Sequence, residues 1–305
     1  MAIACRVRRT ALAAAALAAL LAITAGSASA AAPPGTKTVR ARGITITYKS
    51  IGAGRPLLLI NGSGATLDTW DPVLLDALGA KRRIVIFDPR GMGATTDVAG
   101  DRLTVEEMAD DAAGLLAALH IKRADVLGWS LGGFVAQEVA IRHAALVRRL
   151  VLASSSPGGR NATEATPQVQ AIDEKTTRGL AAPDEFLPIL FPAQAQDAGN
   201  AWIGRLLAQP GGCCEVFTPE AGGRQVAAQR RWYAASGGDE KRLGRIQAPT
   251  LIGAGALDQD VPAANARLLH RRIRGSKLKI YGDAGHAFLI QHALPFAGVV
   301  RKFLG

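Results

Sequence analysis

Short apolar runs, each bounded by glycine or proline, recur along this 305-residue chain and constrain its fold more than any other feature. Runs of this kind are typical of strands buried on both faces of a parallel sheet. They occupy residues 57–60, 83–87, 125–129, 150–153, 250–252 and 278–281. Stretches with helical spacing lie between them, and the clearest begins at Thr104, where Glu107 three residues on fits a capping box. The alternation predicts an α/β protein with a doubly wound, mostly parallel sheet.

Further elements extend this pattern at both ends of the chain. Alternating apolar residues predict two strands at 38–42 and 44–50. Helices are expected at 131–143, 263–272 and 292–303. No fixed period repeats along the chain, so a solenoid or a propeller is not expected.

Residues 155–247 interrupt the alternation of strand and helix. They are rich in Ala, Gly, Gln, Pro and Thr and contain no apolar run like those of the flanking strands. Helical pieces are expected at 169–180, 201–207 and 223–235. The composition therefore predicts an inserted, mostly helical cap within a single domain that spans residues 31–305.

The first thirty residues have the three-part layout of a secretory signal. Arg6, Arg8 and Arg9 precede an apolar run of Ala and Leu, and Ala28-Ser29-Ala30 follows as a cleavage pattern of small residues. The apolar run has roughly fifteen residues, fewer than the roughly twenty that span a bilayer. We therefore expect residues 1–30 to be a signal peptide and the protein to be secreted or in the cell envelope, with no stable membrane insertion after cleavage. A membrane anchor is the alternative.

The charge and the cysteines exclude several classes of protein. The formal charge of +11 becomes +8 once the three arginines of residues 1–30 are removed. The densest basic stretch is Arg267, Arg271, Arg272, Arg274, Lys277 and Lys279. No aromatic residues interleave with it, so nucleic acid is not an expected partner. Cys213 and Cys214 are adjacent, and neighbouring cysteines rarely form a disulfide.

Nothing in the sequence indicates a metal or a cofactor. No His or Cys cluster has the spacing of metal ligands. Asp88-Pro89-Arg90-Gly91-Met92-Gly93 contains a Gly-x-Gly, but the dinucleotide fingerprint and the P-loop lysine are missing. We therefore expect Asp88 and Arg90 to tie loops together beneath the site.

The segment Gly128-Trp129-Ser130-Leu131-Gly132 carries the G-x-S-x-G pattern of a nucleophile elbow. A predicted strand leads directly into it and a predicted helix leads directly out. Glycines flank the serine because this turn brings backbone segments too close for a Cβ. The pattern predicts that Ser130 is a nucleophile at the carboxyl edge of the sheet.

With these motifs in order, the chain resembles the α/β-hydrolase superfamily, in its serine-nucleophile branch with a helical cap. The motifs that carry the resemblance are 61–64 (Asn-Gly-Ser-Gly), 87–93, the elbow, 255–258 with 261–262, and 285–286. A serine at position 130 disfavours the branches with an aspartate nucleophile. The elbow resembles that of small-acyl carboxylesterases.

The general base must be a histidine, since only imidazole titrates near neutrality. Of the five histidines, His286 lies in a Gly-flanked loop after the last strand, where the resemblance places the base. Asp258 follows the 250–252 strand in the order Ser, Asp, His and is expected to orient His286. Asp260 is its main rival, but the spacing from Asp258 to Pro262 matches the family better.

The oxyanion hole needs two backbone N–H donors. Leu131 supplies one, and the resemblance implies that Ser63 supplies the other. Asn61 departs from the family pattern, which has His at this place, and this puts the bracing of the loop in doubt. A plain turn at residues 61–64 is the alternative.

Together these residues predict two-step acyl transfer to water, on a small or medium carboxylic ester or lactone. Three rivals stay open: an aminopeptidase-type serine peptidase, a cofactor-free perhydrolase or haloperoxidase, and a non-catalytic ligand-binding protein. A peptidase would need acidic cap residues for the substrate amine, and the candidates are Asp184, Glu185, Asp239 and Glu240. The residues give no signal for an oligomeric state.

Overall fold

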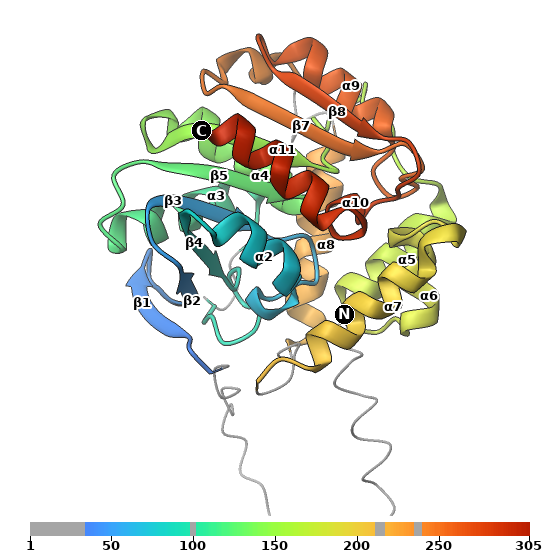
Figure 1. Cartoon of the computed structure of the whole chain (residues 1–305), viewed down its shortest axis with the longest axis horizontal. Coiled ribbons are helices and arrows are strands. Elements are labelled where there is room, and N and C mark those ends of the chain that lie inside the picture. The colour runs from blue at the N-terminus through green and yellow to red at the C-terminus, as the bar shows by residue number, and fades with distance from the viewer. Residues whose placement is uncertain (1–33, 98–101, 211–216, 235–239) are drawn as a thin grey trace, which may run out of the picture.

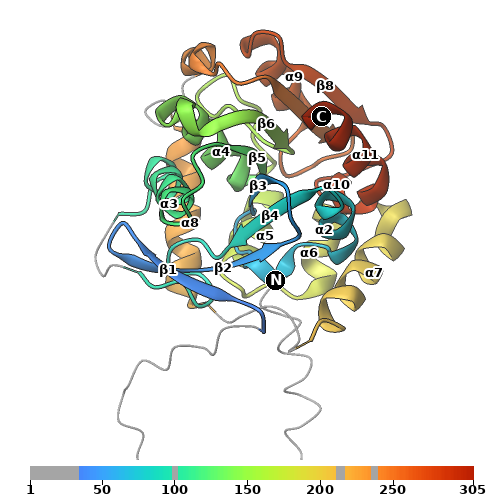
Figure 2. The ribbon, with the colours of Figure 1, turned by 60° about the vertical axis from the view of Figure 1, so that its left-hand side comes forward.

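An eight-stranded sheet organises the computed structural model, which describes residues 34–97, 102–210, 217–234 and 240–305. The strand order is β1–β2–β4–β3–β5–β6–β7–β8. The strands are β1 (Lys37–Ala41), β2 (Ile44–Ile51), β3 (Arg55–Ile60), β4 (Arg82–Phe87), β5 (Ala124–Trp129), β6 (Val147–Ala153), β7 (Thr250–Gly255) and β8 (Lys277–Tyr281). β2 pairs antiparallel with both β1 and β4, and all the other pairings are parallel. Figure 2 shows β1 and β2 at one edge of the sheet and β8 at the other.

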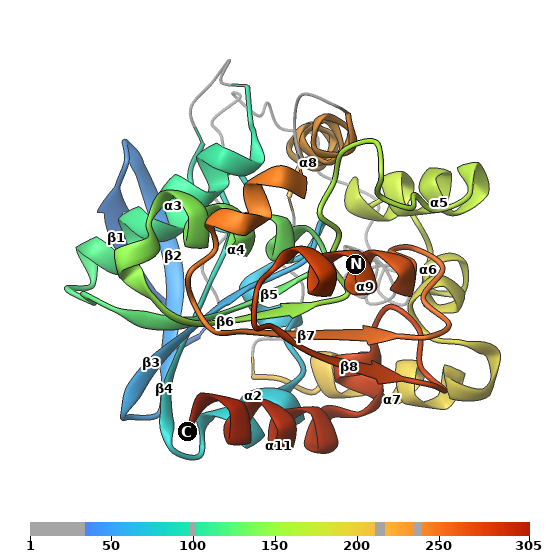
Figure 3. The ribbon, with the colours of Figure 1, turned by 90° about the horizontal axis from the view of Figure 1, so that it is seen from above.

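Helices cover both faces of the sheet (Figure 1). They are α2 (Pro72–Gly79), α3 (Val105–Ala118), α4 (Leu131–Arg142), α5 (Pro167–Thr177), α6 (Pro183–Leu190), α7 (Gln196–Leu207), α8 (Pro219–Tyr233), α9 (Ala263–Arg272), α10 (Phe288–Gln291) and α11 (Ala293–Leu304). Short 3-10 turns occur at Leu67–Thr69, Ala144–Leu146, Ala193–Ala195 and Glu240–Arg245. α2 and α11 lie on one side of the sheet, and α3 and α4 lie on the other (Figure 3). The predicted doubly wound, mostly parallel α/β sheet is thereby confirmed.

The core is divided between the two faces of the sheet. One buried cluster joins the strands to α3, α4 and α9, and the other joins them to α2, α7 and α11. Every residue of β5 is buried, as the continuous apolar run predicted for a strand covered on both sides. The carboxyl end of β5, and Ser130 after it, therefore begin from a fully buried strand within the sheet.

Two helices that begin with proline were not expected from the sequence. At α2, Asp71 accepts a hydrogen bond from the N–H of Val73 (3.1 Å), and Pro72 occupies the first helical position. This Asp-Pro start is a signal that the sequence did contain. α6 likewise begins at Pro183, and it holds a second proline, Pro188, inside the helix. By contrast, the predicted cap at Thr104 is present, since its Oγ1 accepts from the N–H of Glu107 (3.1 Å).

Residues between β6 and β7 form α5 to α8, where helical pieces were predicted at three places. α5, α6 and α7 lie beyond the arrowheads of β7 and β8, at the carboxyl edge of the sheet (Figure 3). The predicted signal at residues 1–30, Cys213, Cys214 and Asp239 lie outside the described residues.

Candidate active site

Ser130, the predicted nucleophile, lies at the turn between β5 and α4. Its backbone has φ 56° and ψ −122°, a conformation that L-residues rarely adopt. Its N–H donates to the carbonyl of Ala153 (2.9 Å), and its carbonyl accepts from Gly133 N–H (2.8 Å). These bonds hold the strained residue between the sheet and the first turn of α4, as expected of a functional elbow.

Close backbone approaches explain the glycines around Ser130. A Cβ on Gly128 would lie 2.2 Å from the carbonyl oxygen of Gly132, and one on Gly132 would lie 2.1 Å from that of Ile60. A Cβ on Gly133 would lie 2.3 Å from Ser155 Oγ. The β5–α4 turn therefore tolerates no side chain at these three positions.

The loop after β3 packs directly against this turn. A Cβ on Gly62 would lie 3.4 Å from Ser130 Cβ, so the Gly62–Ser63 peptide is next to the predicted nucleophile. Asn61 braces the loop: its Nδ2 donates to Thr69 Oγ1 (2.7 Å), and its Oδ1 accepts from Gly62 N–H (2.9 Å). The side-chain amide of Asn61 thus braces this loop, at the position where the family pattern has a histidine.

His286 and Asp258, the predicted base and its orienting acid, lie together and are buried. The Nδ1 of His286 is 3.1 Å from Asp258 Oδ1 and 3.0 Å from Oδ2. Asp258 Oδ1 also accepts from the N–H groups of Asp260 (3.0 Å) and Val261 (2.8 Å). The aspartate is therefore held by its own turn while it orients the imidazole.

Asp260, the rival acid, contacts the opposite side of the same ring. Its Oδ2 lies 3.4 Å from His286 Nε2, the nitrogen that a serine nucleophile would need. Within the described residues, no hydrogen bond joins Ser130 Oγ to His286. The structure thus brings the histidine and both acids together, and leaves Ser130 next to them without the Ser–His bond. Such bonds often form only when substrate is present.

The two carboxylates change the protonation of His286. Burial alone would lower the pKa of His286, but the charges of Asp258 and Asp260 raise it to about 9. Burial raises the pKa of Asp260, although His286 opposes this shift. At neutral pH the side chain of His286 is therefore an imidazolium, with Asp258 next to Nδ1 and Asp260 next to Nε2.

The loop that carries His286 is anchored from β5 and β6. The carbonyl of His286 accepts from Trp129 Nε1 (3.3 Å) and from Ser154 Oγ (2.9 Å). The Trp129 ring lies 5.7 Å, centroid to centroid, from the imidazole. Ser154 itself has a positive φ of 44°. The sequence identified neither residue as a support of the base, because the contacts join segments far apart in the chain.

A cavity of about 250 Å³ opens next to Ser130. Its lining comes from the elbow (Ser130, Phe134), the segment before α5 and α5 itself (Glu164, Ala165, Pro167, Gln170, Ala171, Asp173, Glu174), α8 (Val226, Gln229, Arg230, Tyr233) and the turn after β7 (Asp260, Val261). The cavity therefore lies between the carboxyl edge of the sheet and the two helices α5 and α8.

The lining is more acidic than basic. Arg230 donates a hydrogen bond to Glu174 (2.5 Å). No cationic residue of the lining lies within ion-pair distance of Glu164, Asp173 or Asp260. Asp260 instead contacts His286, which does not line the cavity. Burial, reinforced by the nearby charge of Asp260, raises the pKa of Asp173 well above its ordinary value.

The acidic cap residues proposed from the sequence are not those of the lining. Asp184 and Glu185 lie in the first turn of α6, outside the cavity lining, and Glu185 pairs with Lys175. Asp239 and the side chain of Glu240 lie outside the described residues. The candidates Asp184 and Glu185 therefore do not line this cavity, and nothing local in the sequence tells which face of a helix turns toward it.

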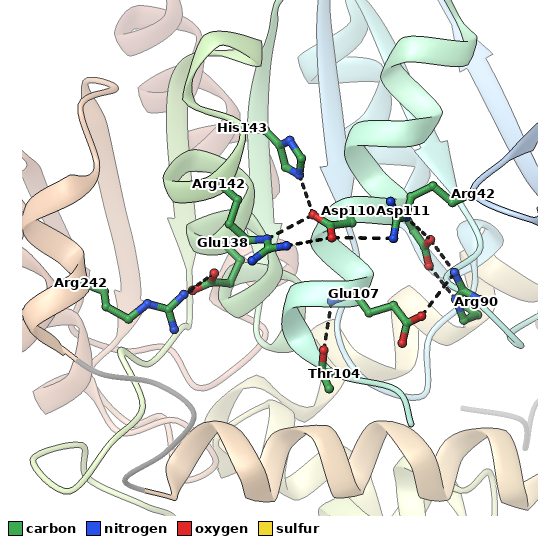
Figure 4. A network of polar contacts seen from close by, with 10 residues as sticks. All are labelled: Arg42, Arg90, Thr104, Glu107, Asp110, Asp111, Glu138, Arg142, His143 and Arg242. Carbon is green, nitrogen blue, oxygen red and sulfur yellow. Dashed lines mark hydrogen bonds and ion pairs between the residues drawn. The ribbon is translucent and has the colours of Figure 1, made fainter. Parts of the chain in front are cut away.

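Asp88 and Arg90 tie loops together, as predicted. Asp88 accepts from Leu67 N–H (2.7 Å). Arg90 makes a bidentate bond with buried Asp111 on α3 (2.8 and 2.7 Å), and this pair is part of the network in Figure 4. The network continues through Asp110 to His143, 2.7 Å away, so that histidine has a structural contact rather than a place at the site.

Among the described residues, no three or more His, Cys, Asp or Glu side chains are grouped so that they could hold a metal ion. No helix in this part of the chain is both long and apolar enough to cross a membrane.

Comparisons with known proteins agree with this architecture. Residues 55–293 match the family described as alpha/beta hydrolase fold. The 2-hydroxymuconate semialdehyde hydrolase of Pseudomonas sp. (strain CF600) is 30% identical over 274 residues, covering 88% of this chain and 93% of that protein. The pimeloyl-acyl-carrier-protein methyl ester esterase of Neisseria meningitidis serogroup B (strain H44/76) is 30% identical over 270 residues, covering 83% and 93%. The solved structure of an alpha/beta hydrolase fold protein from Chitinophaga pinensis has a TM-score of 0.78 at 28% identity, covering 90% and 98%.

Proposed function

Because the chain belongs to the α/β-hydrolase fold family, we propose that it is a serine hydrolase of small or medium carboxylic esters or lactones. The observation that carries the proposal is the position of Ser130. It sits in a strained turn at the wall of a cavity that Asp260 also lines, and Asp260 contacts the His286 of the buried His286–Asp258 pair. The cavity volume of about 250 Å³ lies near the lower end of ligand pockets, which favours a small acyl group.

The proposed reaction has two acyl-transfer steps. Ser130 Oγ attacks the carbonyl carbon, and His286 Nε2 takes the hydroxyl proton. Asp258 stabilises the imidazolium and keeps the proton on Nδ1. The N–H groups of Ser63 and Leu131 hold the oxyanion. His286 then protonates the leaving alcohol, which departs and leaves Ser130 acylated. In the second step His286 takes a proton from a water molecule that attacks the acyl carbon, and it returns this proton to Ser130 Oγ as the carboxylic acid leaves.

Turnover by this route requires His286 to exchange partners. Its Nε2 must leave the carboxylate of Asp260, now 3.4 Å away, and accept a hydrogen bond from the hydroxyl of Ser130. The exchange needs a neutral imidazole, so we expect the rate to rise with pH up to the raised pKa of His286.

Export completes the proposal. The signal-like residues 1–30 support a mature protein that is secreted or held in the cell envelope. N-terminal sequencing of protein recovered outside the cytoplasm would test this, and an intact Met1 would contradict it.

A fluorophosphonate probe tests the nucleophile directly. We expect one covalent adduct on the purified protein by intact mass, and none on Ser130→Ala. His286→Ala should label at least a hundredfold more slowly, because it lacks the base. A folded wild type that takes no adduct and hydrolyses no p-nitrophenyl ester would contradict the proposal and favour a ligand-binding protein.

The acidic lining favours a second candidate, an acyl substrate that bears a protonated amine. Asp173 and Asp260 lie on the cavity wall, where no arginine or lysine of the described residues pairs with them, and Glu164 lines the same cavity. An ammonium group there would relieve the repulsion between Asp173 and Asp260. We expect aminoacyl esters or arylamides to be preferred over neutral analogues of the same size.

The comparison of wild type with Asp173→Asn tests this candidate. The variant should lose about tenfold in kcat/KM for the amine substrate and little for its N-acetylated analogue. Equal losses on the two substrates, or no preference in the wild type, would leave the neutral ester as the substrate class.

A further inference from the structure

Of three consecutive backbone N–H groups after β3, the two outer ones have side-chain acceptors and the middle one has none among the described residues. Gly62 N–H donates to Asn61 Oδ1 (2.9 Å), and Gly64 N–H donates to Gln225 Oε1 (2.8 Å). The N–H of Ser63, between them, has no acceptor among the described residues. The two outer groups are therefore fixed by amide side chains, and the middle one is available to a ligand.

We propose that Gln225 of α8 is a positioning residue that holds the Ser63 N–H in place for the oxyanion. The inference rests on the proposed serine hydrolase function. Gln225 is separated from Gly64 by 161 positions in sequence, and it reaches the loop from the helix that also lines the substrate cavity. A bond on each side of Ser63 limits the rotation of both flanking peptides, so the central donor keeps one direction.

The burial of Gln225 supports a dedicated role. Its side chain is fully buried (0% exposed), and its Nε2 has no hydrogen-bond partner within the described ranges, whereas its Oε1 accepts from Gly64 N–H. A buried amide that leaves its donor unsatisfied costs free energy, so packing alone would favour an apolar residue here. The bond to Gly64 is the contribution that offsets this cost.

The loop and the helices around it are in backbone contact. Gly64 has φ +64°, and a Cβ on it would lie 2.7 Å from Thr177 Cα at the end of α5. A Cβ on Gly222 of α8 would lie 2.3 Å from the carbonyl oxygen of Thr177. The loop, α5 and α8 thus pack without side chains between them, so a displacement of α8 is transmitted to the oxyanion loop through Gln225.

The test removes the acceptor and keeps the volume. Gln225→Met should lower kcat about 10- to 100-fold, somewhat less than the loss of a complete oxyanion donor, with KM changed less than about threefold. Affinity for a trifluoromethyl ketone, whose tetrahedral adduct needs the oxyanion hole, should fall by the same factor as kcat. Gln225→Glu keeps an acceptor oxygen in either protonation state, and should recover most of both losses.

Gln247→Met is the matched control, because Gln247 is exposed and does not line the cavity. All rates are divided by the concentration of active sites titrated with fluorophosphonate, so partial unfolding does not count as lost catalysis. If Gln225→Met does not fold, Gln225→Asn, whose shorter side chain cannot reach Gly64, replaces it.

The outcomes separate the two proposals. A wild type that neither labels nor turns over contradicts the serine hydrolase itself. A wild type that labels and turns over, with kcat and ketone affinity unchanged in Gln225→Met or Gln225→Asn, overturns the positioning role alone. A loss in kcat without a loss in ketone affinity also overturns it, since the oxyanion hole would then be intact.

Discussion

Asp260 offers the sharpest test of the electrostatics at the site. Its Oδ2 lies 3.4 Å from His286 Nε2 and, with Asp258, raises the pKa of His286 to about 9. Asp260→Asn keeps the shape of the side chain and removes the charge. Asp258 remains on Nδ1, so the imidazole stays oriented. The pKa of His286 should therefore fall while the Asp258–His286 pair stays assembled.

The expected shift follows from the distance. Two unit charges about 4 Å apart interact by about 4 kcal/mol at an effective dielectric constant of about 20, which corresponds to about three pKa units. This is an upper bound, because burial raises the pKa of Asp260 and so reduces its mean charge. Opposite charges at this range shift pKa values by about one to three units, so we expect a fall of about one to two units.

The pH profile of kcat/KM is the assay. A base with a pKa of about 9 is neutral in about 1% of molecules at pH 7, and one with a pKa of about 8 in about 10%. The rising part of the profile should move to lower pH, and kcat/KM at pH 7 should rise about 10- to 50-fold for a neutral ester, as the pKa falls by about one to two units. Asp184→Asn, at an exposed carboxylate on α6, is the control and should leave the pH profile unchanged. If the pH dependence of kcat/KM is the same in Asp260→Asn as in the wild type, the reasoning is refuted.

The pH dependence of the melting temperature is an independent test of the Asp260–His286 contact. The pKa of His286 is raised in the folded state, so its ion pairs stabilise the protein fully below the unfolded value of about 6.5. That stabilisation is lost as the pH rises through about 9. Asp260→Asn should flatten the dependence of the melting temperature on pH in this window.

Three further substitutions test the scaffold and the orienting acid. Gly132→Ala should destabilise the protein by more than about 3 kcal/mol in urea unfolding, since its Cβ would lie 2.1 Å from the carbonyl oxygen of Ile60; a stable, active variant would contradict the elbow geometry. Arg90→Met should cost up to about 3–5 kcal/mol because it leaves buried Asp111 with only Arg42, 3.5 Å away, and adding Asp111→Leu should recover most of that loss. Asp258→Asn should lower kcat about 10⁴-fold, and it should lower the melting temperature more below pH 6 than above pH 9, because its ion pair with His286 is complete only at the lower pH; a loss in kcat under tenfold would remove Asp258 from its proposed role.

Elements with local signals could be predicted from the sequence. The apolar runs predicted the parallel strands, because a strand covered on both faces is apolar at most of its positions. The cap at Thr104 and the strand–turn–helix around Ser130 are also local, since capping and backbone sterics act within a few residues. The unexpected helices, α2 and α6, begin at prolines, which are common in loops but also suit the first helical turn.

The sequence by itself determined the class of fold, the place of the elbow and the short list of acids and bases. These depend on periodicity, on glycines that no other residue can replace, and on chain order. Only the tertiary structure decided which acid contacts which nitrogen. Asp258 and Asp260 are two residues apart, and a small difference in the turn after β7 directs one to Nδ1 and the other to Nε2. Only the tertiary structure also brought Asp173 and Gln225 to the site, because the packing of α5 and α8 over the sheet depends on contacts between segments distant in sequence.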